Sequence, residues 1–158
     1  MKICLYSDIH AQLPQLEAVQ AAVDKENPDR EIVIGDLIML GPDPAEVVDN
    51  IMNRPKAVSV VGNLDLWVVN KRWETHEPKS PHQAWMFGMA KQTRELLSEE
   101  QLDYLRNLPF TMTITPEYGH DFHIFHGTPY EIGDEDAIPL RLTDDEVADK
   151  IKTVDAAV

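Results

Sequence analysis

Three short apolar runs alternate with two helical segments before residue 63, and this alternation restricts the chain to very few folds. Residues 2–7, 31–34 and 57–61 are predicted strands, and the first is expected to be buried on both faces. Residues 13–26 and 44–53 carry apolar residues at helical spacing, and the second stretch begins with a proline. The strand–helix–strand–helix–strand order predicts a parallel sheet with right-handed crossovers.

The rest of the chain is predicted to be mostly helical and then to form a hairpin. A capping box at Ser98–Gln101 and another at Thr143–Glu146 each predict the start of a helix. The expected helices cover residues 64–71, 81–97, 98–108 and 143–152, with a polar, proline-containing loop at 73–80. The expected hairpin strands are residues 110–115 and 121–126, and an acid-rich loop follows them.

Length and charge exclude several classes of function. With 158 residues, the chain is expected to form a single domain, residues 1–158. Its net charge of −14 repels phosphate backbones, so we expect no nucleic-acid polymer as a partner. It lacks the run of about eighteen apolar residues needed to span a membrane, and its N-terminus does not resemble a signal peptide. We therefore expect a cytoplasmic protein without a membrane partner.

Polar side chains with metal-binding atoms follow the predicted strands directly. Asp8 and His10 follow the first strand, Asp36 the second and Asn63 the third, while His126 ends the last strand. Ligands of open α/β sheets bind outside the carboxyl ends of the strands. The sequence therefore predicts that these five side chains meet at one edge and hold metal.

Four motifs around these residues resemble, in order and spacing, those of the calcineurin-like metallophosphoesterases. They are Ser7-Asp-Ile-His10, Gly35-Asp36, Gly62-Asn-Leu-Asp65 and His126-Gly-Thr-Pro129. The stretch 35–44 is most similar to the bacterial and archaeal branch of phosphodiesterases or diadenosine-tetraphosphatase-like phosphatases, and the resemblance extends over residues 1–130. It implies an α/β/β/α sandwich of two mixed sheets flanked by helices, with the second sheet incomplete in this chain.

The resemblance also implies a chemistry. Asp36 would bridge two divalent cations, with Asp8 and His10 completing one metal site and Asn63 and His126 the other. Mixed nitrogen and oxygen donors suit manganese, iron, zinc or nickel, and we favour manganese. A hydroxide held by the metals would then attack a phosphodiester or phosphomonoester bond of a small-molecule or nucleotide substrate. The catalytic residues implied are Asp36, Asn63 and Asp65.

Two features depart from the family pattern. No histidine follows His126, whereas the family ends its site with a Gly-His-x-His motif. We therefore expect the chain to be a truncated piece of a longer protein; the alternative is a member that has lost part of its site. Leu64 stands where the family has a histidine that protonates the leaving oxygen and that Asp65 would orient. The alternative function is a catalytically weak phosphate- or nucleotide-binding protein with a degenerate metal site.

Overall fold

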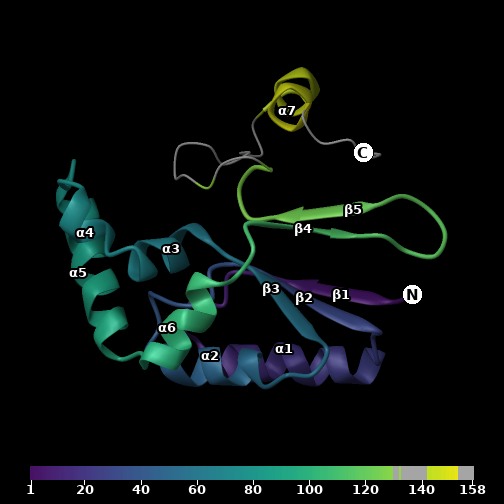
Figure 1. Cartoon of the computed structure of the whole chain (residues 1–158), viewed down its shortest axis with the longest axis horizontal. Helices are drawn as coiled ribbons and strands as arrows, with labels where there is room; N and C mark the ends of the chain where they lie inside the picture. The colour runs from purple at the N-terminus through teal and green to yellow at the C-terminus, as the bar shows by residue number, and fades with distance from the viewer. Residues whose placement is uncertain (130–131, 133–141, 153–158) are drawn as a thin grey trace.

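A computed structural model of the chain describes residues 1–129, 132 and 142–152. It confirms the predicted parallel sheet, in which β1 (Ile3–Tyr6), β2 (Arg30–Ile34) and β3 (Ala57–Val60) are neighbours in the order β1-β2-β3. The connecting helices α1 (Leu13–Glu26) and α2 (Pro44–Met52) lie against the same face of this sheet (Figure 1). Because the strands are parallel, their carboxyl ends meet at one edge.

Each of the two crossover helices carries a proline at its start and buries one, mostly apolar, face against the sheet. Both helices have a proline in their first two positions, and α1 ends at Asn27 in the left-handed conformation. The buried positions are Leu16, Gln20 and Val23 in α1, and Pro44, Val47, Val48 and Ile51 in α2. Each fully buried aliphatic side chain contributes about 1.5–3 kcal/mol, so these faces hold the helices on the sheet.

A group of helices extends the core beyond the end of the sheet. It consists of α3 (Asn63–Val69), α4 (Arg72–Thr75), α5 (Pro81–Glu95) and α6 (Glu99–Arg106). The Trp67 and Phe87 rings join α3 to α5 edge to face, with centroids 5.2 Å apart. The predicted loop at 73–80 therefore differs in part, because residues 72–75 form the short helix α4 and its Trp73 packs on the core.

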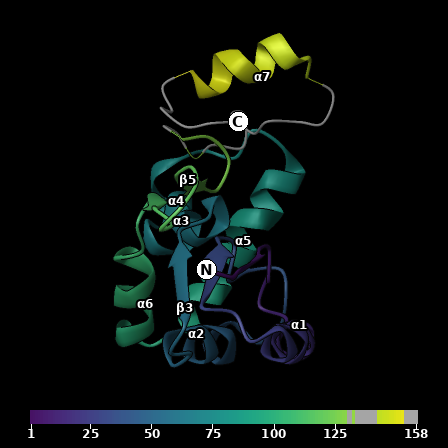
Figure 2. The same cartoon turned by 90° about the vertical axis from the view of Figure 1, so that its right-hand side faces the viewer.

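The predicted hairpin is also present, and it covers the sheet face opposite α1 and α2 (Figure 2). Strands β4 (Thr111–Ile114) and β5 (Phe122–Phe125) pair antiparallel. Ile114 and Ile124 of the hairpin pack with Ile32 and Val60 of the sheet. Since β5 ends one residue before His126, this contact brings the histidine to the carboxyl ends of the parallel strands. Helix α7 (Asp144–Ile151) begins at the predicted capping box, whereas the acid-rich loop lies outside the described residues.

One expectation for the first strand was wrong. We predicted residues 2–7 to be buried on both faces, yet Leu5 is 54% exposed. The reason is that β1 forms an edge of the sheet, and the hairpin packs mainly on Ile32 of β2 and Val60 of β3, with Ile3 of β1 at the margin of that cluster. Within the described part of the chain, no helix has the length and apolar character needed to cross a membrane.

Candidate metal centre

The loops that follow β1 and β2 hold three candidate ligands in a backbone conformation that is unusual for residues with side chains. Asp8, His10 and Asp36 have φ values of 56°, 51° and 52°, in the left-handed region. This conformation costs roughly 1–2 kcal/mol per non-glycine residue, so neighbouring contacts must impose it. Backbone bonds do so, since Asp8 N donates to Gly35 O at 3.2 Å and His10 N donates to Asp36 O at 3.0 Å.

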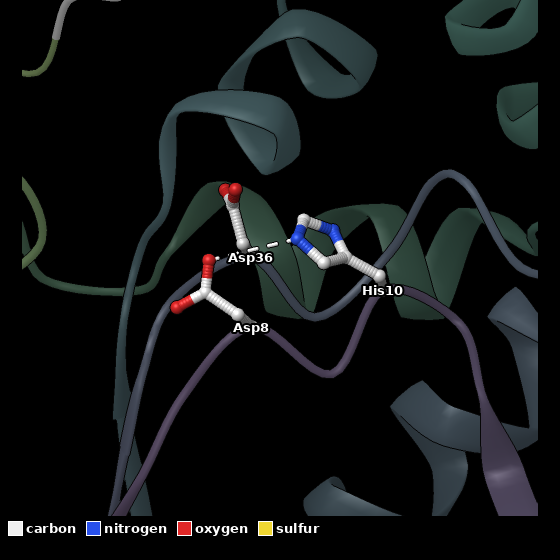
Figure 3. Close-up of side chains that lie close together, drawn as sticks. All are labelled: Asp8, His10 and Asp36. Atoms are coloured by element: carbon white, nitrogen blue, oxygen red, sulfur yellow. Dashed lines mark ion pairs between the residues drawn. The ribbon is translucent and has the colours of Figure 1, made fainter. Parts of the chain in front are cut away.

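Asp8, His10 and Asp36 form a cluster whose potential ligand atoms all lie within 4.8 Å of one another (Figure 3). His10 Nε2 lies 3.5 Å from Asp8 Oδ1. Asp36 is buried, with 4% of its surface exposed, whereas the Asp8 side chain is 56% exposed. The cluster thus has a buried carboxylate at its base and an accessible carboxylate at its mouth.

Asp36 also faces the other pair of predicted ligands, Asn63 and His126. His126 Nδ1 contacts the carbonyl oxygen of Ile34 at 2.7 Å, and a carbonyl only accepts, so Nδ1 carries the proton. In a neutral imidazole, Nε2 is then a lone-pair donor. Nε2 lies 3.0 Å from Asn63 Oδ1 and 3.7 Å from Asp36 Oδ2. The structure thus brings all five predicted ligands to one edge of the sheet.

The donor atoms fit divalent cations. His126 Nε2 and Asn63 Oδ1 lie 3.0 Å apart, so a single cation can contact both atoms. His10 presents Nε2 to the cluster, 3.5 Å from Asp8 Oδ1. Mixed imidazole, carboxylate and amide donors favour the first-row transition metals over calcium. Asp8, His10 and Asp36 can therefore hold a metal ion, and Asn63 and His126 lie close to the same central carboxylate.

Gly62 allows the two loops to approach each other closely. A Cβ atom at Gly62 would lie 2.1 Å from Asp36 N and 2.2 Å from Asp36 Oδ1, which is far inside van der Waals contact. Gly35 adopts a φ of +70° and packs on Gly62 from the other side, where a Cβ would meet Gly62 Cα at 2.7 Å. The two glycines that follow β2 and β3 thus make room for the central carboxylate.

Asp65 lies fully buried beneath this site and bonds to backbone. Its Oδ1 accepts from Leu37 N at 2.9 Å and from Ile38 N at 3.2 Å, and its Oδ2 accepts from Gly62 N at 2.9 Å. Burial, together with the negative charge of Asp36, raises the pKa of Asp65 to about 6. The sequence predicted Asp65 as a catalytic residue; in the structure its carboxylate joins the two loops.

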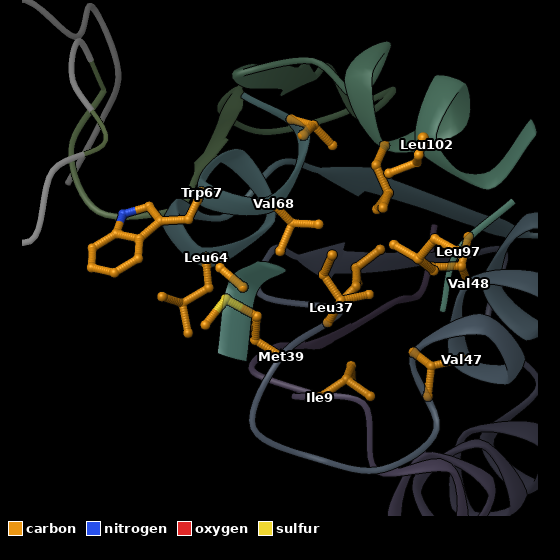
Figure 4. Close-up of a cluster of buried hydrophobic side chains, with 14 of the residues drawn as sticks. Ile9, Leu37, Met39, Val47, Val48, Leu64, Trp67, Val68, Leu97 and Leu102 are labelled. Carbon is orange, nitrogen blue, oxygen red and sulfur yellow. The ribbon is translucent and has the colours of Figure 1, made fainter. Parts of the chain in front are cut away.

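Leu64 presents only its backbone to the site. Leu64 N donates to Asp36 Oδ1 at 2.9 Å. The side chain is 6% exposed and lies in the hydrophobic core with Met39 and Trp67 (Figure 4). Position 64 therefore supplies a hydrogen bond that fixes Asp36 but no proton-donating side chain.

We expect Asp65→Asn to lower the free energy of unfolding by about 1–3 kcal/mol, because Nδ2 of asparagine would face a buried backbone N–H. Chemical denaturation followed by circular dichroism measures this loss. Glu146→Gln is the matched control, since Glu146 occupies the same capping position in α7 but is exposed, and it should cost a few tenths of a kcal/mol. Equal losses in both variants would contradict a special role for the buried carboxylate.

The chain is similar to known proteins in sequence and in fold. The profile of the calcineurin-like phosphoesterase family matches residues 1–155. A metallophosphoesterase crystal structure from Sphaerobacter thermophilus is 26% identical, with a TM-score of 0.70, over 98% of this chain and 57% of that one. A hypothetical protein from Pyrococcus horikoshii is 20% identical, with a TM-score of 0.80, over 96% of this chain and 64% of that one.

The similarity to a curated protein is shorter. An uncharacterized protein from Methanocaldococcus jannaschii is 30% identical over 107 residues, which make up 68% of this chain. The matched region spans 42% of that protein. The two solved structures share the fold that the sequence motifs implied.

Proposed function

This chain belongs to the calcineurin-like phosphoesterase family, and on that premise we propose that it is a metal-dependent hydrolase of phosphate esters. It uses two divalent cations to hydrolyse phosphodiester or phosphomonoester bonds of a small-molecule or nucleotide substrate. The observation that carries the proposal is the convergence of Asp8, His10, Asp36, Asn63 and His126 from four strand ends. We favour manganese, because the donor set mixes imidazole nitrogen with carboxylate and amide oxygen.

When bound, two cations neutralise charge on phosphorus oxygens and lower the pKa of a water molecule. The side chains of this site carry out the remaining tasks. Asp36 lies between both ligand groups, and its Oδ1 is fixed by the backbone of Leu64. Asn63 completes the half of the site that contains His126, without adding charge. The Nδ1–H group of His126 donates a hydrogen bond to Ile34 O. In the neutral imidazole, this leaves the lone pair of Nε2 available to a metal ion.

Electrostatics favour an anionic substrate at this site despite the net charge of −14 on the chain. Asp8 and Asp36 contribute two negative charges, so two divalent cations would leave a local formal charge of about +2. Bound ions are often the largest charges in such a site. A phosphate ester would thus be attracted locally while long nucleic-acid polymers are repelled by the rest of the surface.

A second candidate function is binding of a phosphate or nucleotide without efficient turnover. The observation that favours it is Leu64, which contacts Asp36 through its backbone only and packs its side chain in the core, so that position 64 offers the site no proton donor. This candidate uses the same ligands and differs only in catalytic power.

Purified protein with added Mn²⁺ is expected to hydrolyse bis-p-nitrophenyl phosphate, and excess chelator should abolish the reaction until the metal is restored. Release of p-nitrophenolate, followed by absorbance, measures the rate. Asp36→Asn serves as the control for contaminating hydrolases, because it changes the central ligand while leaving the rest of the sequence intact. Metal and phosphate binding without turnover would favour the second candidate, and binding of neither would contradict both.

A further inference from the structure

The carbonyl oxygen of Ile34 lies within hydrogen-bond distance of a donor from each half of the candidate metal centre. His126 Nδ1 donates to it at 2.7 Å, and Ser7 Oγ lies 2.8 Å from it. Ile34 is the last residue of the central strand β2, whereas Ser7 follows β1 and His126 follows β5. A carbonyl has two lone pairs, so Ile34 O can accept from both His126 and Ser7.

Ser7 Oγ also contacts Oδ2 of Asp8. A hydroxyl has a single proton and both contacts are with acceptors, so Ser7 shares this proton between Ile34 O and Asp8 Oδ2 in a three-centre hydrogen bond. The other oxygen of this carboxylate, Oδ1, lies 3.5 Å from His10 Nε2 and belongs to the candidate metal cluster. Asp8 is more than half exposed, and an exposed carboxylate that lacks such a contact samples several rotamers. The Ser7 hydroxyl therefore selects the orientation in which Oδ1 faces His10 and Asp36 (Figure 3).

We propose that Ser7 is a positioning residue for the metal centre, because it holds Asp8 in its ligating orientation. Ser7 also contacts Ile34 O, the same carbonyl oxygen that accepts the hydrogen bond orienting His126. The proposal rests on the proposed function, because it assigns Asp8 and His126 to the two halves of a metal site. Groups that orient metal ligands typically change metal affinity by 10–100-fold when they are removed. Ser7 is exposed, so its loss should act on the metal centre and leave the hydrophobic core unaltered.

Ser7→Ala is expected to weaken Mn²⁺ binding about tenfold, measured by isothermal titration calorimetry, and to alter the visible absorption spectrum of the Co²⁺-loaded protein. Ser7→Thr keeps a hydroxyl at the same position and should bind Mn²⁺ within about twofold of the original protein. Ser59→Ala is the matched control. The Ser59 hydroxyl also contacts a β2 carbonyl, Val33 O at 3.1 Å, but it contacts no candidate ligand in the described structure.

The outcomes separate the two proposals. If the unmodified chain binds Mn²⁺ and Ser7→Ala binds it equally well with an unchanged Co²⁺ spectrum, the role of Ser7 is wrong and the proposed function stands. A comparable weakening in Ser59→Ala would also overturn it, because the effect would then be a general loss of stability. If the unmodified chain binds neither Mn²⁺ nor Co²⁺, the proposed function fails, and the role of Ser7 fails with it.

Discussion

Replacing Gly62 with alanine is expected to reduce Mn²⁺-dependent hydrolysis by about 100-fold or more, since displacement of a catalytic group by about 1 Å can cost that much. The new Cβ would lie 2.2 Å from Asp36 Oδ1 and 2.1 Å from Asp36 N, so the central carboxylate must move. Gly62 itself has φ −97° and ψ 169°, which alanine adopts readily. The effect is therefore steric and acts directly on Asp36.

The measurement combines steady-state hydrolysis of bis-p-nitrophenyl phosphate with calorimetric titration of Mn²⁺. Gly88→Ala is the control, because a Cβ at Gly88 meets no atom within 4 Å and the residue lies inside α5. This variant should keep full activity and gain about 0.5–1 kcal/mol of stability from the higher helix propensity of alanine. Unchanged metal affinity and activity in Gly62→Ala would show that Asp36 does not need its present position.

The fold of the first 62 residues could be predicted because each local signal agreed with the others. Apolar runs, helical periodicity and a proline at the start of α2 all point to the observed strands and helices. The burial of β1 could not be predicted in the same way. Whether Leu5 is covered depends on the position of a hairpin more than 100 residues later in the chain, and no local pattern encodes that position.

The meeting of Asp8, Asp36 and Asn63 at one edge could also be predicted, because parallel strands bring the residues that follow them to a single edge. His126 reaches the same edge through the packing of the antiparallel hairpin on the sheet.

The contacts that support these ligands could not be predicted. Asp65 bonds to Leu37 N, and His126 bonds to Ile34 O. Their partners are backbone groups, which every residue has, so residue type gives no signal for them. Ser7 belongs to the first of the four sequence motifs, but its contact with Ile34 O follows only from the pairing of β1 with β2.

The hydrolysis rate of the Mn²⁺-loaded protein is expected to fall steeply as the pKa of the leaving group rises. Leu64 is packed with Met39 and Trp67 and has no proton to donate to a departing oxygen. A p-nitrophenolate departs without a proton, whereas an alkoxide or a ribose oxygen needs one. General acid catalysis contributes about 10²–10⁴-fold to the rate when the leaving group needs a proton. Without it, alkyl esters should lose this factor, whereas activated aryl esters should not.

Leu64→His tests this argument by restoring a titratable group at the N-terminus of α3. The variant should raise the rate on dialkyl phosphates by a far larger factor than the rate on bis-p-nitrophenyl phosphate, because only the first reaction gains from a proton donor. Leu64→Met is the control, since it keeps the volume of the side chain without adding a proton donor. A polar imidazole at a position that is 6% exposed will cost roughly 1–3 kcal/mol of stability, so rates are compared at a temperature where circular dichroism shows both variants folded.

If both rates rise by the same factor, position 64 acts through binding or packing, and the absence of an acid at this position does not set the substrate preference.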